Sequence, residues 1–99
     1  MSDEHPTRLQ IHRWYRRGKR AFRGNFKNHY EVAVEWYRKA AEAGHKDAQY
    51  ELGMCYLRGE GVPKDDYTAY TWFREAGHNG HPDGQYLADD MLRVHEMML

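Results

Sequence analysis

The side chains that could carry chemistry in this sequence are few: one serine, one cysteine and seven histidines. Ser2 lies too close to the N-terminus to be held beside a base, so no serine triad can be built. Cys55 would need a neighbouring base to act as a nucleophile, and nothing in the sequence indicates one. His78 and His81 have a short spacing, but Gly80 predicts a break between them, and zinc sites usually need three or four ligands. We therefore predict that the protein is not an enzyme and holds no metal or cofactor.

The run Gly59-Glu60-Gly61 is glycine-rich, as phosphate-binding loops are. It lacks both the Gly-Lys-Ser/Thr ending and the preceding strand that such loops require. We interpret it as a connection between two helices.

Helical segments account for most of the chain. The predicted helices span residues 8–23, 29–43, 47–58, 66–79 and 84–98. Four glycines just past helix ends predict left-handed C-caps: Gly24, Gly44, Gly59 and Gly80. Asp65 is a natural N-cap after the loop that contains Pro63. Alternation with a period of two is not sustained anywhere, so we predict no sheet.

The middle of the chain matches itself when shifted by 36 residues. The segment from Ala33 to His45 then aligns with the segment from Ala69 to His81, with Trp36 on Trp72 and His45 on His81. A shift of 35 places Tyr15, Gly18, Arg23 and Gly24 on Tyr50, Gly53, Arg58 and Gly59. The sequence therefore predicts a repeat made of two helices, present about two and a half times.

The composition predicts a folded core and indicates the cellular compartment. The aromatic content of 14% is too high for a disordered chain, so we expect a core built from aromatic side chains and alanine. No apolar run is long enough for a membrane span or a signal peptide, and Cys55 has no partner for a disulfide. We expect a cytoplasmic protein with a disordered tail over residues 1–7 and a single domain over 8–99.

Two segments resemble the Sel-1-like repeat family, a relative of the tetratricopeptide repeats. The segment Asp47–Asp65 is similar to the family's first helix and loop, and Trp36–His45 is similar to its second helix and exit. The resemblance covers most of the chain from residue 11. It implies an all-α fold, a short right-handed α-solenoid of about five helices, and an adaptor or scaffold without an active site.

Small and aromatic residues are expected to pack the helices together. Gly18 and Gly53 should sit where two helix axes approach, because a glycine inside a helix costs about 1 kcal/mol and needs a packing reason. The pairs Trp36-Tyr37 and Trp72-Phe73 are spaced to pack between repeats. Some positions depart from the family pattern and predict capping or specialised roles at the ends: Arg17, Gly77, Gly84 and Asp89.

The first helix is the strongest candidate for a binding surface. On a helical wheel its apolar residues gather on one side and its cations on the other. The candidate cations are Arg13, Arg16, Arg17, Lys19, Arg20 and Arg23. Residues 1–46 hold eleven Lys or Arg and five Asp or Glu, a net charge of +6, whereas residues 47–99 hold four and ten, a net of −6. An arginine-rich face can bind an acidic protein or a nucleic-acid backbone, or serve only to keep a terminal repeat soluble.

Two further surfaces are candidates. The family resemblance implies an inner groove lined by the first helices, where Arg16, Lys19 and Arg23 align with Glu51, Met54 and Arg58. The last helix carries Met91, Val94, Met97 and Met98, and methionine suits adaptable contacts. This face could contact a partner or a second copy of the chain. Alternatively, the last helix folds back on the preceding helices and buries the face.

These observations predict a non-catalytic protein–protein interaction module. We expect a small intracellular adaptor, regulator or inhibitor that docks an acidic protein partner through its basic first helix and inner groove. One alternative is a module that contacts nucleic acid with the same arginines. Another is a homodimeric assembly piece that associates through the methionine-rich last helix.

Overall fold

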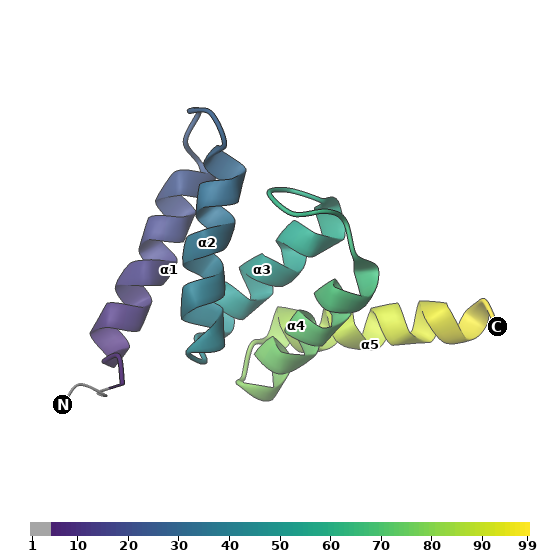
Figure 1. The fold of residues 1–99 in the computed structure, drawn as a ribbon. Coiled ribbons are helices and arrows are strands. Elements are labelled where there is room, and N and C mark those ends of the chain that lie inside the picture. The colour runs from purple at the N-terminus through teal and green to yellow at the C-terminus, as the bar shows by residue number, and fades with distance from the viewer. Residues whose placement is uncertain (1–4) are drawn as a thin grey trace.

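The computed structural model describes residues 5–99, and their regular structure is entirely helical (Figure 1). The five helices are α1 (Arg8–Phe22), α2 (His29–Glu42), α3 (Lys46–Arg58), α4 (Asp66–His78) and α5 (Pro82–Met97). Each boundary lies within two residues of the predicted one. No strand occurs in residues 5–99, so the predicted all-α class is confirmed.

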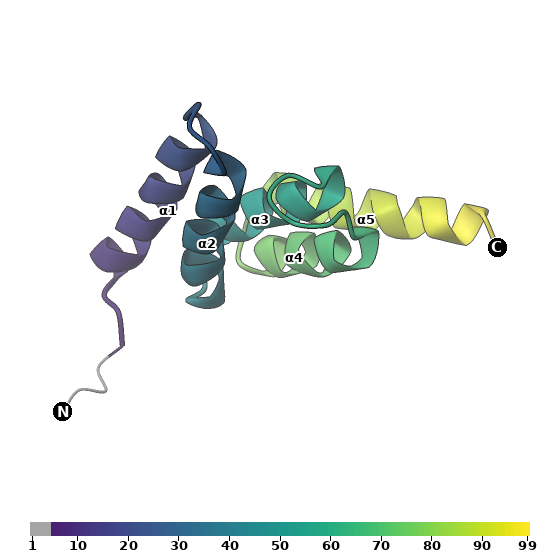
Figure 2. The same cartoon turned by 45° about the horizontal axis from the view of Figure 1, so that its top comes forward.

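The helices pack mainly on their neighbours in the chain: α1 on α2, α2 on α3, α3 on α4, and α4 on α5. The result is elongated, with principal extents of 49 × 32 × 21 Å. In both views the C-terminal half of α5 extends past the other helices (Figures 1 and 2). This serial packing is the arrangement expected of a helical repeat.

Two glycines form the helix crossings, as the sequence predicts. A Cβ atom on Gly18 would lie 2.6 Å from the ring of Tyr37, and one on Gly53 would lie 2.7 Å from the ring of Phe73. Tyr37 and Phe73 are almost fully buried, at 2% and 0% exposure. Each aromatic ring therefore lies against the backbone of the first helix of its own repeat, and a larger residue than glycine would displace it.

Helix ends follow the predicted glycine signals with one exception. Gly44, Gly59 and Gly80 have φ values of 96°, 72° and 98°, which confirms their left-handed conformation. The prediction for Gly24 is wrong, because Asn28 is the residue in the left-handed region of this turn, with φ of 63°. A side chain closes the end of α1 instead: Nδ1 of His29 lies 3.1 Å from the carbonyl oxygen of Phe22.

Side chains cap the starts of α1, α3, α4 and α5, whereas Asn28 at the start of α2 makes no side-chain cap. Asp65 caps α4, as predicted, because its carboxylate accepts the backbone N–H of Thr68 at 3.1 Å and the hydroxyl of Thr68 at 2.8 Å. These two bonds hold the pKa of Asp65 below its usual value. Thr7 caps α1 by accepting the N–H of Gln10 at 3.1 Å.

The departures from the repeat pattern have structural reasons in the last helix pair. A Cβ atom on Gly84 would lie 2.9 Å from the Cβ of Ala76, and one on Gly77 would lie 2.7 Å from Gln85, so both glycines allow α4 and α5 to approach closely. Asp89 is the residue of α5 that aligns with Gly53, and it is exposed. Its carboxylate accepts an amide N–H of Gln85 at 3.0 Å. This outer face of α5 is polar, as expected of a terminal repeat.

The N-terminal tail is described only in part. Residues 5–7 have no regular structure, and the rest of the predicted disordered tail lies outside the described residues. Within residues 5–99, no helix combines the length and the apolar character needed to cross a bilayer.

Candidate partner-binding surface

The predicted basic face of α1 forms a defined recess. Side chains one and two turns apart surround a cavity of about 180 Å³ on the surface of this helix. The cavity is lined by Arg16, Lys19, Arg20 and Arg23. None of these four side chains forms an ion pair within residues 5–99. The recess therefore presents four positive charges that can neutralise an anionic group from another molecule.

The other two predicted cations of α1 lie outside the recess. Arg13 is exposed, and Arg17 is turned toward α2. The guanidinium carbon of Arg17 lies 4.9 Å from the ring centroid of Trp36, within the range of a cation–π contact. Arg17, which departs from the family pattern, therefore covers an aromatic ring of its own protein.

The aligned row on α3 differs in character from the row on α1. Glu51 and Met54 are half-buried, Met54 packs against the core cluster of Ala69 and Phe73, and Arg58 is exposed. Burial raises the pKa of Glu51, and the cation of Lys19 on α1 counteracts this effect. Lys19 of α1 is thus close enough to Glu51 of α3 to act on it electrostatically.

The aromatic ring of Tyr15 lies beside Lys19. Burial, together with the carboxylates of Glu51 and Asp47, raises the pKa of Tyr15 to about 12. The ammonium of Lys19 lies 5.7 Å from the ring centroid of Tyr15. The Tyr15 hydroxyl is therefore protonated at neutral pH and can donate a hydrogen bond to an anionic ligand.

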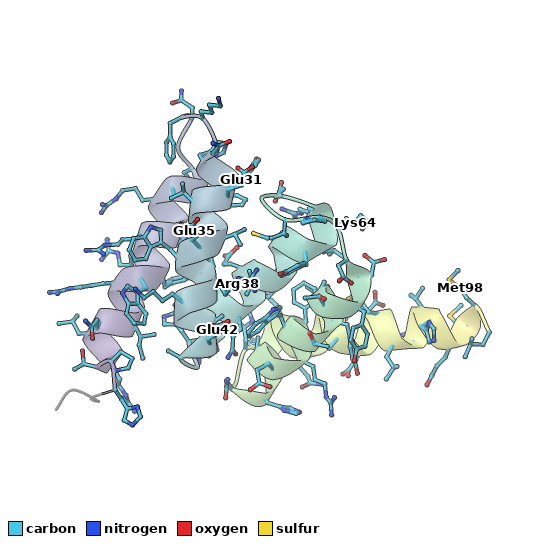
Figure 3. The ribbon with its side chains drawn as sticks, viewed as in Figure 1. Glu31, Glu35, Arg38, Glu42, Lys64 and Met98 are labelled. Carbon is cyan, nitrogen blue, oxygen red and sulfur yellow. The ribbon has the colours of Figure 1, made fainter. Side chains whose placement is uncertain are left out.

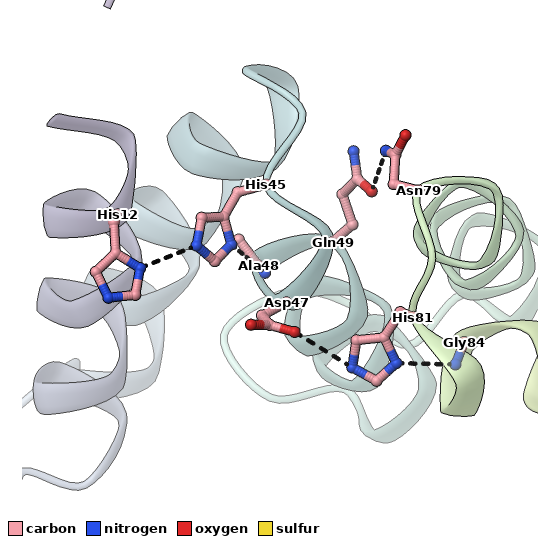
Figure 4. A network of polar contacts seen from close by, with 8 residues as sticks. All are labelled: His12, His45, Asp47, Ala48, Gln49, Asn79, His81 and Gly84. Carbon is pink, nitrogen blue, oxygen red and sulfur yellow. Dashed lines mark hydrogen bonds and ion pairs between the residues drawn. The ribbon is translucent and has the colours of Figure 1, made fainter. Parts of the chain in front are cut away.

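The structure also contains a repeated histidine arrangement that the sequence analysis missed (Figure 4). His45 stacks on Tyr15 with ring centroids 4.5 Å apart, and its Nδ1 atom accepts the N–H of Ala48 at 3.1 Å to cap α3. His81 does the same one repeat later: it stacks on Tyr50 at 4.4 Å and accepts the N–H of Gly84 at 3.2 Å to cap α5. The alignment of His45 with His81 and of Tyr15 with Tyr50 was the available signal.

Capping fixes the tautomer of both imidazoles. Because Nδ1 accepts a backbone N–H, the ring proton of each neutral histidine lies on Nε2. Nε2 of His45 lies 3.2 Å from Nδ1 of His12, and Nε2 of His81 lies 3.6 Å from a carboxylate oxygen of Asp47. Burial lowers the pKa of His45, which favours this neutral form. These histidines hold successive first helices in register.

The predicted methionine surface of α5 is only partly exposed. Met91 is half-buried and packs against the cluster of Ala69, Phe73 and Ala88. Val94, Met97 and Met98 are 47%, 79% and 80% exposed. The C-terminal end of α5 therefore does not fold back on the preceding helices, and Met91 belongs to the core face rather than to the open surface.

Two observations concern the groups considered for catalysis and metal binding. Cys55 is 1% exposed, and burial raises the pKa of its thiol to about 12, which disfavours the reactive thiolate. Within residues 5–99, no three His, Cys, Asp or Glu side chains are placed to hold a metal ion together.

Comparison with known proteins identifies the repeat. The sequence pattern of the Sel1 repeat matches residues 13–45 and 46–81, which correspond to the first two helix pairs. The chain belongs to the Sel1 repeat family. The remaining helix, α5, occupies the place of the first helix of a third repeat, so the predicted two and a half repeats are confirmed. Sel1 repeat proteins generally mediate protein–protein interactions.

Two solved structures share the fold. This chain is similar to a protective antigen with an SLR fold from uropathogenic Escherichia coli, with a TM-score of 0.76 and 36% identity over 82% of this chain and 17% of the antigen. It is also similar to a Sel1 repeat protein from Oxalobacter formigenes, with a TM-score of 0.74 and 32% identity over 82% of this chain and 24% of that protein.

Curated relatives match over a shorter stretch. An exopolysaccharide production negative regulator from Rhizobium leguminosarum bv. viciae is 48% identical over 40 residues, which are 40% of this chain and 15% of the regulator. The DAP3-binding cell death enhancer 1 of Rattus norvegicus is 42% identical over 36 residues, 36% of this chain and 7% of that protein. The match thus spans only a small part of each relative.

Proposed function

We propose that this Sel1 repeat domain binds an acidic protein segment through the recess of α1 and the adjoining surface of α3. The observation that carries the proposal is the convergence of four cations, Arg16, Lys19, Arg20 and Arg23, around one cavity without an ion-pair partner in residues 5–99. Arginine binds carboxylates through two parallel hydrogen bonds, so such a recess recognises their geometry as well as their charge.

The surface around the recess extends the contact. Lys19 connects the recess with Tyr15 and Glu51, and Arg58 continues the row on α3. A partner segment with acidic groups near α1 and a hydrogen-bond acceptor near Tyr15 would be complementary to this row. In this proposal the protein is a small cytoplasmic adaptor, regulator or inhibitor, and its similarity to a negative regulator supports the regulatory role.

The alternative of a nucleic-acid partner rests on the same arginines. Recognition of single strands usually adds exposed aromatic rings on which bases stack. The aromatic rings near the α1 cations are occupied within the protein, because Tyr15 stacks on His45 and Trp36 is covered by Arg17. This occupancy favours the protein partner. The open end of α5, with Met97 and Met98, remains a candidate surface for homodimer formation.

The experiment is a pull-down from native lysate, with and without nuclease, using the wild-type protein and the double variant Arg16→Glu/Arg20→Glu. We expect the wild type to retain a nuclease-resistant protein partner and the variant to lose it, while the circular dichroism spectra of both stay helical. Arg13→Glu/Arg93→Glu is the matched control, because it reverses two exposed charges outside the recess.

Three results would contradict the proposal. Capture that disappears with nuclease would assign the arginines to nucleic acid. Retention by the recess variant would exclude the recess as the binding surface. A molecular mass that rises with concentration and falls on Met97→Ser/Met98→Ser would assign binding to self-association through α5.

A further inference from the structure

A second groove lies between α2 and α4, apart from the recess of α1. Its cavity of about 460 Å³ lies within the range of roughly 300–1,000 Å³ that is usual for small-ligand sites. Trp72 and Glu75 of α4 line the groove, and Glu42 at the end of α2 lines it from the other side. Figure 3 shows Glu42 following Glu31 and Glu35 along α2.

The polar side chains on the floor of this groove are hydrogen-bonded within the protein. Gln49 is 2% exposed, its amide N–H donates to the carbonyl oxygen of Ala41 at 3.0 Å, and its amide oxygen accepts from Asn79 at 3.0 Å. The hydroxyl of Thr71 donates to the carbonyl oxygen of Thr68 at 2.7 Å. The charged groups left to bind a ligand are therefore the carboxylates of Glu42 and Glu75, beside a half-buried indole.

The repeat itself indicates which ligand the groove accepts. Trp36 occupies in the first repeat the position of Trp72 in the second, and it is covered by Arg17 at 4.9 Å and Lys39 at 5.7 Å. The positions aligned with Arg17 and Lys39 are Leu52 and Glu75. Consequently no Lys or Arg of residues 5–99 lies over Trp72, and a carboxylate stands where the first repeat has an ammonium.

We propose that the groove between α2 and α4 binds an arginine side chain from a basic segment of a partner protein. Leu52, in the place of Arg17, is buried in the core cluster against which Trp72 packs. The guanidinium would therefore take the place that Lys39 has beside Trp36 and would bond to Glu42 and Glu75. Arginine suits this site because its planar fork stacks on aromatic rings and matches carboxylates. Glu31 and Glu35 have no ion-pair partner in residues 5–99 and lie farther along α2, beyond Arg38, whose guanidinium donates to the hydroxyl of Tyr56 at 2.6 Å. The site is independent of the α1 recess, so the domain has one surface for an acidic partner and one for a basic partner.

The test uses the indole N–H signals of the three tryptophans in proton–nitrogen correlation spectra. The probe is the peptide Arg-Gly-Arg-Gly-Arg, and Glu-Gly-Glu-Gly-Glu is the charge-reversed control. We expect the arginine peptide to shift the Trp72 signal in a saturable manner and to leave Trp14 and Trp36 unchanged. Both of those rings already carry a cation, since Lys39 lies 4.7 Å from the ring of Trp14.

Charge variants locate the site without affecting the core, because both glutamates are exposed. Glu42→Gln and Glu75→Gln should each weaken peptide binding about threefold. Glu75→Lys restores the cation that the first repeat has at this position and should abolish the Trp72 shift. Glu96→Gln on α5 is the matched control and should bind as the wild type does.

Other outcomes would overturn the inference. Equal shifts of all three indoles would mean that the peptide binds without a preferred site. Full binding by Glu75→Lys, or no Trp72 shift at millimolar peptide, would exclude the groove. A Trp72 shift on concentrating the protein alone, with a rising molecular mass, would assign the groove to a second copy of the chain rather than to a basic partner.

Discussion

The ring of Tyr50 lies flat on the imidazole of His81, with centroids 4.4 Å and planes 10° apart. The same imidazole accepts the backbone N–H of Gly84 and so caps the start of α5. One side chain therefore stacks on the second repeat and caps the helix that follows it. The pair of Tyr15 and His45 repeats this relationship at 4.5 Å. A helix cap contributes about 1 kcal/mol, and stacking adds a similar amount, about 0.5 to 1.5 kcal/mol. Each histidine therefore connects the first helices of two adjacent repeats.

As the pH falls, protonation of His45 should lower the stability of the protein. Burial lowers the pKa of His45, Asp47 opposes this effect, and His12 and Lys46 reinforce it. Between the lowered pKa and the usual value of 6.5, the unfolded chain binds more protons than the folded one. Stability is thus fully present above pH 6.5 and is lost as the pH falls through the lowered pKa. Thermal unfolding between neutral and mildly acidic pH measures the slope.

The control for this pH effect is His45→Asn, which keeps a capping oxygen but does not titrate. Its Tm should fall less steeply over the same pH range than that of the wild type. At neutral pH the free energy of unfolding of this variant should be lower than that of the wild type by about 1 kcal/mol or less, because asparagine is also a good N-cap. Identical slopes for the two proteins would show that His45 does not control the acid response.

Gly53→Leu should strongly destabilise the domain. A Cβ atom at this position already lies 2.7 Å from the ring of Phe73, so a leucine side chain must push α3 and α4 apart. We expect a loss of about 3 kcal/mol in the free energy of unfolding and a Tm lower by more than about 10 °C. Asp89→Leu is the matched control at the aligned position of α5, which is exposed. It should change stability by no more than about 0.5 kcal/mol. An unchanged Tm for Gly53→Leu would refute the crossing role of this glycine.

Arg17 and Arg20 should differ in their effect on stability. Arg17 covers Trp36 at 4.9 Å, whereas Arg20 lines the recess and has no ion-pair partner in residues 5–99. Arg17→Ala should lower the free energy of unfolding by about 0.5 to 1 kcal/mol, and Arg20→Ala should leave it within about 0.5 kcal/mol of the wild-type value. Denaturant titrations measure both values. A double-mutant cycle with Trp36→Leu should give a coupling energy for Arg17 and none for Arg20; equal couplings would argue against the cation–π contact.

The thiol of Cys55 should be unreactive until the protein unfolds. It is 1% exposed, and burial, reinforced by Glu60 and Glu51, raises its pKa to about 12. At pH 8 its thiolate fraction should therefore be roughly a thousandfold below that of a free cysteine. An aromatic disulfide reagent should label the native protein slowly and label it immediately in denaturant. Rapid labelling without denaturant would show that α3 opens readily.

Most of the fold was predictable because its signals are local. Glycines, the N-cap Asp65 and the repeat of small residues determine where each helix begins, ends and crosses its partner. Gly24 misled the prediction because its position matches a C-cap, but His29 closes α1 from the next helix. Such a tertiary contact leaves no local pattern in the sequence.

The candidate surface was predicted less completely than the fold. A helical wheel places all six cations of α1 on one polar face, and it cannot show that Arg17 is turned toward Trp36 while four others surround a recess. The role of His45 and His81 also required the structure, since capping and stacking depend on where the next helix begins. The contrast between Trp36 and Trp72 is visible only when the repeat alignment is combined with the contacts around each ring.

The serial packing of the helices has a mechanical consequence. Within residues 5–99, α5 packs mainly on α4 and each earlier helix mainly on its immediate neighbours, so the main contacts do not join α1 to α5. Force applied between the termini would therefore detach helices one after another instead of breaking all contacts at once. Under force the molecule would lengthen in small steps, each at low force. When the force is removed, it would refold as each helix packs on its neighbour again.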